Sequence, residues 1–284
     1  MYSIVKCSEV SDKVIQEGFK AGFVDYIIQI EMDVKTFANH FFGVEGNERE
    51  YSFIAFKNNE PVGVILSGLR TDEPFKTLRC GAMSIKPEER GNGLAQDLMV
   101  KHEEVAKMLG CKQLFLEVIV GNDRAIAFYK KSGYEKVYDL TYRKLLVEEK
   151  GIKFKRDESV YKQVVETDIE EIRKLRSLDL SHMPWQGSFP YIQDMKCHCY
   201  GIKEENELKA GLIMTPEKVY YLWVHPTMRL QGYGSALLLR GINDLEPKSL
   251  RMTYTNNSLV HTFANYIGME LDPISQFEMY KWLD

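Results

Sequence analysis

The first half of the chain alternates between strand-like and helix-like hydrophobic patterns. Alternating apolar positions predict an edge strand over 2–7, and aromatic-rich helical patterns predict helices over 12–30 and 34–42. The turn Asn58-Asn59-Glu60 separates two apolar runs and predicts an antiparallel hairpin. By the same criteria we predict strands over 52–57, 61–69, 78–85, 114–120 and 135–145, and helices over 93–109 and 123–132. This order is typical of a mixed α/β sheet flanked by helices.

The second half repeats the first. The segment 85–95, IKPEERGNGLA, and the segment 224–234, VHPTMRLQGYG, share a proline, an arginine and a later glycine at an offset of 139 (226 − 87). Further downstream, an Asn, a Phe and a Gly recur at an offset of 135 (257 − 122). Two matched blocks in the same order indicate a duplication. The later block consists of Asn122, Phe128 and Gly133, which match Asn257, Phe263 and Gly268, and the second copy's strands are predicted over 197–203, 208–215 and 219–224.

A boundary between the copies is predicted near 147–157. In this stretch, VEEKGIKFKRD, seven of eleven residues are charged and the hydrophobic period lapses. A chain of 284 residues also suits two domains better than one. We therefore predict one domain over 1–146 and a second over 153–284.

Composition and charge exclude several functional classes. Hydrophobic residues make up 44% and charged residues 27% of the chain, which is ordinary for a globular protein. A net charge of −4 gives no basic footprint for nucleic acid. No apolar run approaches the roughly 18 residues of a membrane span, and the first residues do not resemble an export signal. We therefore expect a cytoplasmic protein without a nucleic-acid or membrane partner, and the oligomeric state is left open.

The cysteines do not predict a disulfide framework or a metal site. There are five, scattered along the chain, which favours reduced thiols. The triplet Cys197-His198-Cys199 contains metal-ligand types, but no second ligand pair follows at a zinc-finger spacing. No metal is expected.

The turn at 90–95 predicts an anion site. A glycine turn that follows a strand and opens a helix presents several unpaired N–H groups in one direction, and the helix dipole adds positive potential there. Glycine also lets the backbone approach a phosphate closely. The turn lacks the Lys-Ser/Thr of nucleotide-phosphate loops and the Gly-x-Gly-x-x-Gly of dinucleotide folds.

The two blocks of the first copy together resemble the acetyl-CoA signatures of the GNAT superfamily of N-acetyltransferases. The first is Arg-x-x-Gly-x-Gly/Ala after Pro87, and the second is Asn122-x-x-Ala125-x-x-Phe128-Tyr129-x-x-x-Gly133-Tyr134. Together they span 83–134. The second copy matches the turn fully and the later block in part. The resemblance implies two tandem GNAT-like domains, each with a mixed, mostly antiparallel sheet flanked by helices.

The resemblance also implies roles for individual residues. The backbone of Met83, Ser84 and Ile85 would run beside the pantetheine arm and polarise the thioester carbonyl. Asn122 would hydrogen-bond near that arm, and Tyr129 would protonate the departing thiolate. The CoA pyrophosphate would bind the backbone amides of Arg90, Gly91, Asn92, Gly93, Leu94 and Ala95.

The chemistry requires both an acid and a base. A thiol has a pKa near 8.5 and a phenol near 10, so the Tyr129 hydroxyl can supply a proton to the thiolate. The attacking amine must lose a proton, and Glu117 is the candidate base, with His40 and Glu31 as alternatives. Glu117 also fits an ordinary hydrogen-bonded strand residue, and a water relay would leave no mark in the sequence.

The second copy departs from the first at the predicted acid. Ala264 stands where the first copy has Tyr129 (129 + 135), and Val260 stands where it has Ala125. Alanine cannot protonate a thiolate. The second domain is therefore expected to bind CoA with weak catalysis or to serve as a scaffold.

The sequence thus predicts an acetyl-CoA-dependent N-acetyltransferase that acts on the primary amine of a small molecule. Two alternatives remain open at this stage. One is an acetyltransferase for protein N-termini or lysines, and the other is an acyl-CoA-binding sensor or scaffold without turnover.

Overall fold

The chain forms two compact units. The computed structural model describes residues 1–28, 31–71, 74–147, 157–193 and 195–283. One unit combines Met1–Val137 with Phe277–Asp284, and the other consists of Tyr138–Gln276. Most of the connection predicted at 147–157 lies outside the described residues.

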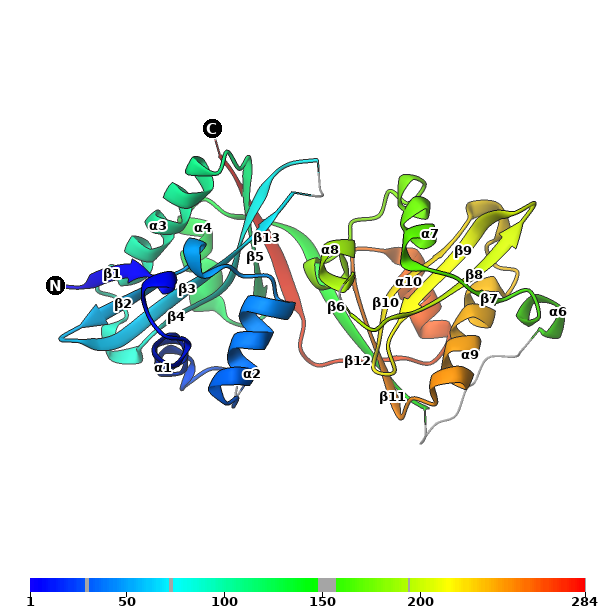
Figure 1. Ribbon diagram of the computed structural model, residues 1–284, viewed down its shortest axis with the longest axis horizontal. Coiled ribbons are helices and arrows are strands. Elements are labelled where there is room, and N and C mark those ends of the chain that lie inside the picture. Colours follow the sequence, from blue (N-terminus) through cyan, green and yellow to red (C-terminus); the bar gives the residue numbers. More distant parts are fainter. Residues whose placement is uncertain (29–30, 72–73, 148–156, 194, 284) are drawn as a thin grey trace. The chain divides into compact units, whose positions relative to one another are not determined.

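The sheet of the first unit has the strand order β1-β2-β3-β4-β5-β13 (Figure 1). The pairs β1–β2, β2–β3 and β3–β4 are antiparallel, whereas the pair β4–β5 is parallel. The elements are β1 (Ser3–Lys6), α1 (Asp12–Phe23), α2 (Val34–Ala38), the π-helical segment η2 (Asn39–Val44), β2 (Phe53–Lys57), β3 (Glu60–Arg70), β4 (Thr77–Ile85), α3 (Leu94–Met108), β5 (Gln113–Ile119), α4 (Asp123–Lys131) and β13 (Gln276–Trp282), with 3-10 turns at Cys7–Glu9, Arg49–Tyr51 and Pro87–Glu89.

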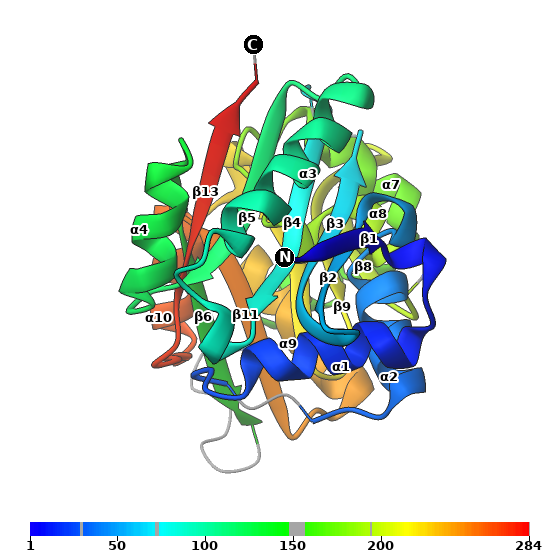
Figure 2. The same cartoon turned by 90° about the vertical axis from the view of Figure 1, so that its left-hand side faces the viewer.

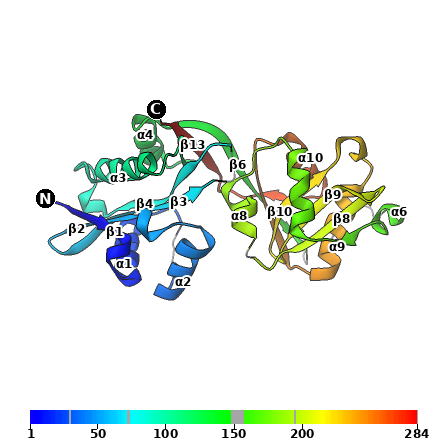
Figure 3. The ribbon, with the colours of Figure 1, turned by 45° about the horizontal axis from the view of Figure 1, so that its top comes forward.

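Helices cover both faces of this sheet, with α3 and α4 on one face and α1 and α2 on the other (Figures 2 and 3). On the α3 face, Leu94 and Leu98 pack against Leu78 and Leu116. On the α1 face, the aromatic residues predicted to line the early helices form a cluster with strand residues. That cluster includes Phe19, Phe37, Phe41, Ile54, Val64 and Leu66.

The sheet of the second unit repeats this arrangement, with the strand order β7-β8-β9-β10-β11-β6. Again the pair that precedes the last strand, β10 and β11, is parallel and the other pairs are antiparallel. The elements are β6 (Glu135–Leu146), α6 (Glu158–Tyr161), β7 (Val165–Glu166), α7 (Ile169–Lys174), α8 (Phe189–Ile192), β8 (His198–Glu204), β9 (Glu207–Met214), β10 (Lys218–Val224), α9 (Tyr233–Leu245), β11 (Ser249–Thr255), α10 (Ser258–Tyr266) and β12 (Glu270–Leu271), with 3-10 turns at Leu175–Ser177, Trp185–Gly187 and Pro226–Met228.

The last strand of each copy completes the sheet of the other copy. Residues Leu140–Leu146 of β6 pair with β11 in the second unit. In return, β13 follows β5 in the first unit, where Met279 is fully buried in the α3-face core. The compact units therefore differ from the predicted domains 1–146 and 153–284 at these two strands. The alternating pattern of a strand indicates which of its faces is buried and not which strand it pairs with, so this exchange could not be predicted from the sequence.

The helices near the N-terminus are shorter than predicted. The helix expected over 12–30 ends at Phe23, and residues 29–30 lie outside the described part of the chain. The helix expected over 34–42 is α-helical only to Ala38 and continues as the π-helical η2. The other predicted strands and helices agree with the structure to within two residues at each end. Both sheets are mixed, mostly antiparallel and flanked by helices, which confirms the predicted fold class.

Candidate functional site

The glycine turn after β4 points a row of backbone N–H groups into open space. Gly91 and Gly93 have φ angles of 79° and 87°, a region that glycine adopts without steric cost. The first helical hydrogen bond of α3 runs from Asp97 N to Gly93 O at 3.0 Å. Across the described residues, no acceptor is recorded for the N–H groups of 91–96. Such a turn is suited to bind an anion.

The second unit contains the same turn. Gly232 has a φ of 87° and caps α9 as Gly93 caps α3. Arg229 Nε donates to Val224 O at 3.0 Å, and Arg90 Nε donates to Ile85 O at 2.9 Å. The conformation thus follows from the shared sequence pattern and not from one unit's surroundings.

The strands β4 and β5 separate just before this turn. Their recorded pairing runs only from Thr77 to Cys80 on β4, although β4 stays paired with β3 as far as Ile85. The register of β4 against β3 shifts between Cys80 and Ala82, which leaves Gly81 as a bulge. An added Cβ at Gly81 would lie 2.1 Å from Asn47 Oδ1. A side chain at this position would have to displace the buried Asn47 side chain, and the bulge lies where the recorded pairing of β4 with β5 ends.

The backbone of Met83, Ser84 and Ile85 follows this bulge. On the β3 side these residues pair with Ile65, Val64 and Gly63. Towards β5 no pairing is recorded for them within the described chain. The predicted thioester-binding segment therefore has one hydrogen-bonding edge that β5 does not occupy.

The predicted acid, Tyr129, lies on α4 and packs against the separating strands. It belongs to the same core cluster as Cys80 and Leu116 and is 8% exposed. Burial, followed by the nearby Cys80 and Tyr26, raises the pKa of Tyr129 well above its usual value. The hydroxyl therefore keeps its proton at neutral pH, as a proton donor must.

Asn122 caps the helix that carries Tyr129. Its Oδ1 accepts from Ala125 N at 3.3 Å, as expected for an N-cap residue. Asn122 also hydrogen-bonds to the hydroxyl of Tyr26, which lowers the pKa of Tyr26 against the larger, raising effect of burial. The side chain is thus engaged with the protein on two sides.

Sequence reasoning did not predict the contacts that the segment just after α1 makes with the site. Asp25 accepts two hydrogen bonds from the Arg90 guanidinium, and the next residue, Tyr26, contacts Asn122. Adjacent residues therefore reach the turns that follow β4 and β5. The residues of each pair, Asp25 with Arg90 and Tyr26 with Asn122, are far apart in the sequence, so no local pattern predicts their contact.

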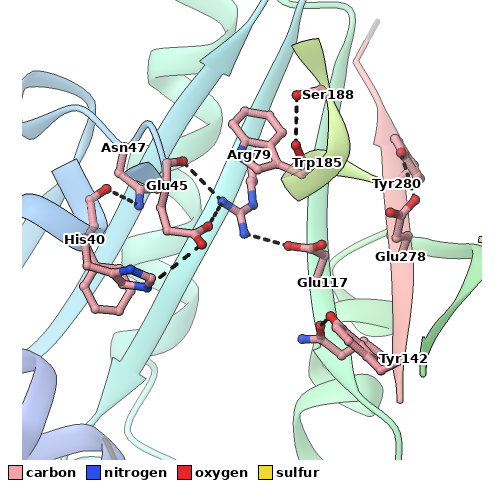
Figure 4. Close-up of polar contacts among 12 residues, drawn as sticks. His40, Glu45, Asn47, Arg79, Glu117, Tyr142, Trp185, Ser188, Glu278 and Tyr280 are labelled. Carbon is pink, nitrogen blue, oxygen red and sulfur yellow. Dashed lines mark hydrogen bonds and ion pairs between the residues drawn. The ribbon is translucent and has the colours of Figure 1, made fainter. Parts of the chain in front are cut away.

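Glu117 belongs to a buried charged cluster on the α1 face of the sheet (Figure 4). Its Oε2 accepts from Arg79 Nη2 at 2.6 Å, and Arg79 Nη1 donates to Glu45 Oε2 at 2.8 Å. Burial is the largest cause of the raised pKa of Glu117. Arg79 lowers that pKa, while the charges of Glu278 and Glu45 raise it.

The alternative bases are placed differently. His40 Nε2 lies 3.9 Å from Glu45 Oε1, so His40 is at the outer end of the same cluster. Glu31 is exposed. The structure therefore brings His40 and Glu117 together through Glu45 and Arg79, neither of which the sequence singled out.

The second unit has no hydroxyl at the position of Tyr129. Ala264 is fully buried, and Tyr266, two residues later, is 61% exposed. Asn257 caps α10 by accepting from Leu259 N and Val260 N, each at 3.1 Å, as Asn122 caps α4. The helix cap is thus retained in the second unit, and the tyrosine hydroxyl is not.

The cysteine-histidine triplet lies at the start of β8. Burial raises the pKa values of Cys197 and Cys199 to about 11. Among the described residues, no group of three or more His, Cys, Asp or Glu side chains is arranged to hold a metal ion. In the same part of the chain, no helix is long and apolar enough to cross a membrane.

The structure resembles solved acetyltransferases over nearly its full length. A GCN5-related N-acetyltransferase from Sphaerobacter thermophilus has a TM-score of 0.71 at 10% identity, covering 99% of this chain and 95% of that chain. A tandem GNAT protein from the clavulanic acid biosynthesis pathway has a TM-score of 0.65 at 12% identity, covering 99% and 98%. At these identities the likeness shows the fold alone.

Sequence comparison identifies the family. The model of the acetyltransferase (GNAT) family matches residues 14–134. An acetyltransferase of Pectobacterium atrosepticum is 30% identical over 122 residues, which cover 42% of this chain and 77% of that protein. N-alpha-acetyltransferase 30 of Schizosaccharomyces pombe is 31% identical over 87 residues, or 30% of this chain and 57% of that protein. The chain therefore belongs to the GNAT family and is an N-acetyltransferase.

Proposed function

We propose that the first unit transfers an acetyl group from acetyl-CoA to the primary amine of a small molecule. The observation that carries this proposal is the placement of Tyr129. Its buried hydroxyl-bearing side chain packs beside the strands β4 and β5 where they separate. The turn at 90–95, for whose N–H groups no acceptor is recorded among the described residues, follows β4 after the 3-10 turn Pro87–Glu89.

The backbone of 90–95 would bind the CoA pyrophosphate, because its N–H groups and the α3 dipole attract phosphate. The backbone of Met83, Ser84 and Ile85 would lie beside the pantetheine arm, with an N–H polarising the thioester carbonyl. Asn122 would border that arm. Support comes from the β5-side edge of β4, where no pairing is recorded for these residues.

The transfer is a direct attack. The amine nitrogen forms a bond to the thioester carbon, and the tetrahedral intermediate then breaks its carbon–sulfur bond. Tyr129 donates its proton to the leaving CoA sulfur, and Glu117 takes the proton that the amine nitrogen loses as it becomes the amide, directly or through a water. The raised pKa of Glu117 supports this role, because a carboxylate with a higher pKa is a stronger base at neutral pH.

The second unit is proposed to be a GNAT-like domain without its own catalysis. The matching strand order and the repeated turn support a tandem arrangement. The buried Ala264 supports loss of the acid. Whether its turn binds CoA is tested below with Gly232→Val.

Thiol release from acetyl-CoA, measured against a library of small amines and short peptides, tests the function. Turnover with small amines and none with peptides is expected. Turnover with peptide N-termini alone would instead favour the second candidate, a protein acetyltransferase, which the similarity to an N-alpha-acetyltransferase motivates. CoA binding without turnover on any acceptor would instead support the other alternative, an acyl-CoA-binding sensor or scaffold.

A further inference from the structure

Arg79 is a buried cation held between two carboxylates from distant segments. It lies on β4 and is 4% exposed. Its two terminal nitrogens bind different partners, Glu45 at 2.8 Å from the η2 side and Glu117 at 2.6 Å from β5 (Figure 4). Nη1 also lies 3.4 Å from the Glu45 carbonyl oxygen. The guanidinium therefore links the segment after α2 to the strand that carries the proposed base.

Glu117 occupies the position where β4 and β5 separate. The recorded pairing of the two strands ends at Cys80 and Leu116, so Glu117 is the first β5 residue beyond it. Its side chain is 6% exposed. Oε2 is held by Arg79, and no hydrogen-bond partner for Oε1 is recorded among the described residues. One oxygen is therefore fixed and the other is left to accept a hydrogen bond.

The charges around Glu117 act in opposite directions. Burial opposes the charged form most strongly, Arg79 favours it, and Glu278 and Glu45 oppose it. Glu45 also shares the guanidinium of Arg79 and so limits how much that guanidinium can stabilise Glu117. His40 lies beyond Glu45, and Tyr280 OH lies 3.4 Å from Glu278 Oε2. A base needs this balance, because a carboxylate paired with an arginine alone becomes a weak proton acceptor.

We propose that Arg79 and Glu45 are positioning residues for Glu117. The guanidinium holds Oε2 so that Oε1 faces the acceptor amine, directly or through one water, and Glu45 divides the guanidinium's charge. This inference rests on the proposed function, in which Glu117 takes the proton of the amine.

The two positioning residues have opposite expected effects on the pH dependence of kcat/KM. Glu45→Gln removes a negative charge, so the guanidinium of Arg79 then interacts with Glu117 alone. The limb of the pH profile of kcat/KM that we assign to the ionisation of Glu117 should therefore move to lower pH. Arg79→Gln removes the positive charge, so the same limb should move to higher pH. Each shift should be about one unit, the effect typical of a neighbouring charge. The same amine is used throughout, so its own ionisation stays constant.

Two controls separate this role from a purely structural one. Arg143 is also 4% exposed, but its recorded hydrogen-bond partners are Tyr254 OH, Met269 O and His261 Nδ1, all in the second unit. Arg143→Gln should leave the limb in place. The double variant Arg79→Gln/Glu45→Gln removes one charge of each sign and should return the limb towards the wild-type position. Circular dichroism and thermal unfolding establish that each variant is folded. If Arg79→Gln does not fold, Glu45→Gln decides alone, with Glu45→Asp expected to restore the wild-type profile.

Failure of this inference can be told apart from failure of the proposed base. Glu117→Gln should abolish the limb and lower kcat by roughly 10²–10⁴-fold. If the limb survives in Glu117→Gln, the base assigned under the proposed function is wrong. If Glu117→Gln abolishes the limb but the Glu45 and Arg79 variants leave it unmoved, or move it in the same direction, the positioning role is refuted.

Discussion

Asp25 accepts two hydrogen bonds from the guanidinium of Arg90, at 2.5 and 2.7 Å, although 65 residues separate them in the chain. Arg90 also donates to Gly22 O at 2.9 Å. These contacts fasten the glycine turn to the end of α1. For the phosphate binding proposed above, a turn whose backbone is already held in place lowers the entropic cost of binding.

Gly93→Val should weaken acetyl-CoA binding by roughly tenfold or more, because a β-branched residue is strained at a φ of 87° and its side chain enters the space before the N–H groups. Arg90→Ala should have a smaller effect, since it removes only a side chain. Calorimetric titration provides the measurement. Gly110→Val imposes similar strain at a φ of 69° away from the turn, and should leave affinity unchanged.

Equal losses in Gly93→Val and Gly110→Val would mean that general destabilisation explains the effect. Gly232→Val makes the corresponding change in the second unit. A lower stoichiometry of CoA binding in that variant would reveal a second site. An unchanged titration would leave the first turn as the only one of the two that binds CoA.

Tyr129→Phe should lower kcat by roughly 10²–10⁴-fold with little change in CoA affinity, because the ring's packing is kept and the proton donor is removed. Steady-state kinetics with a single amine tests this. Tyr134 is the matched control, since its ring lies 5.9 Å from that of Tyr129 and it is likewise buried. A comparable loss in Tyr134→Phe, or near-normal turnover in Tyr129→Phe, would contradict the assignment.

Met279→Ala should destabilise the first unit, although Met279 belongs to the second copy of the sequence repeat. A buried methionine replaced by alanine typically costs about 2–5 kcal/mol. Hydrogen exchange should show protection lost in β4 and β5. Leu271→Ala, at a position 61% exposed, is the control. Loss of protection in β9 and β10 instead would support the domain boundaries expected from the sequence.

His102 should make stability depend on pH between about 3 and 6.5. Burial lowers its pKa to about 3, so the folded state leaves it neutral where the unfolded chain, with a pKa near 6.5, binds a proton. Its contribution is complete above pH 6.5 and falls as the pH drops towards 3, by up to about 1.4 kcal/mol per pH unit. Denaturant unfolding at several pH values should show a shallower decline in His102→Gln. Parallel curves for the two proteins would argue against a neutral, buried His102.

Local structure could be predicted from the sequence wherever it depends on near neighbours. The two glycine turns and the order of strands and helices follow from short patterns. Their physical basis is the backbone conformation that glycine permits and the spacing of apolar positions in strands and helices. The fold class came from this information, whereas the family and the role of Tyr129 came from the resemblance to the GNAT signatures.

The tertiary structure alone decided which distant residues meet. Arg79 is separated from Glu45 by 34 residues and from Glu117 by 38, and each looks locally like an ordinary charge. The pairing of β6 with β11 and the place of β13 beside β5 are equally invisible, because the local pattern of a strand does not specify its neighbours. The sequence determined the type of most segments, although the helices near the N-terminus are shorter than predicted. Long-range packing, which depends on the burial of whole faces, determined which segments lie together.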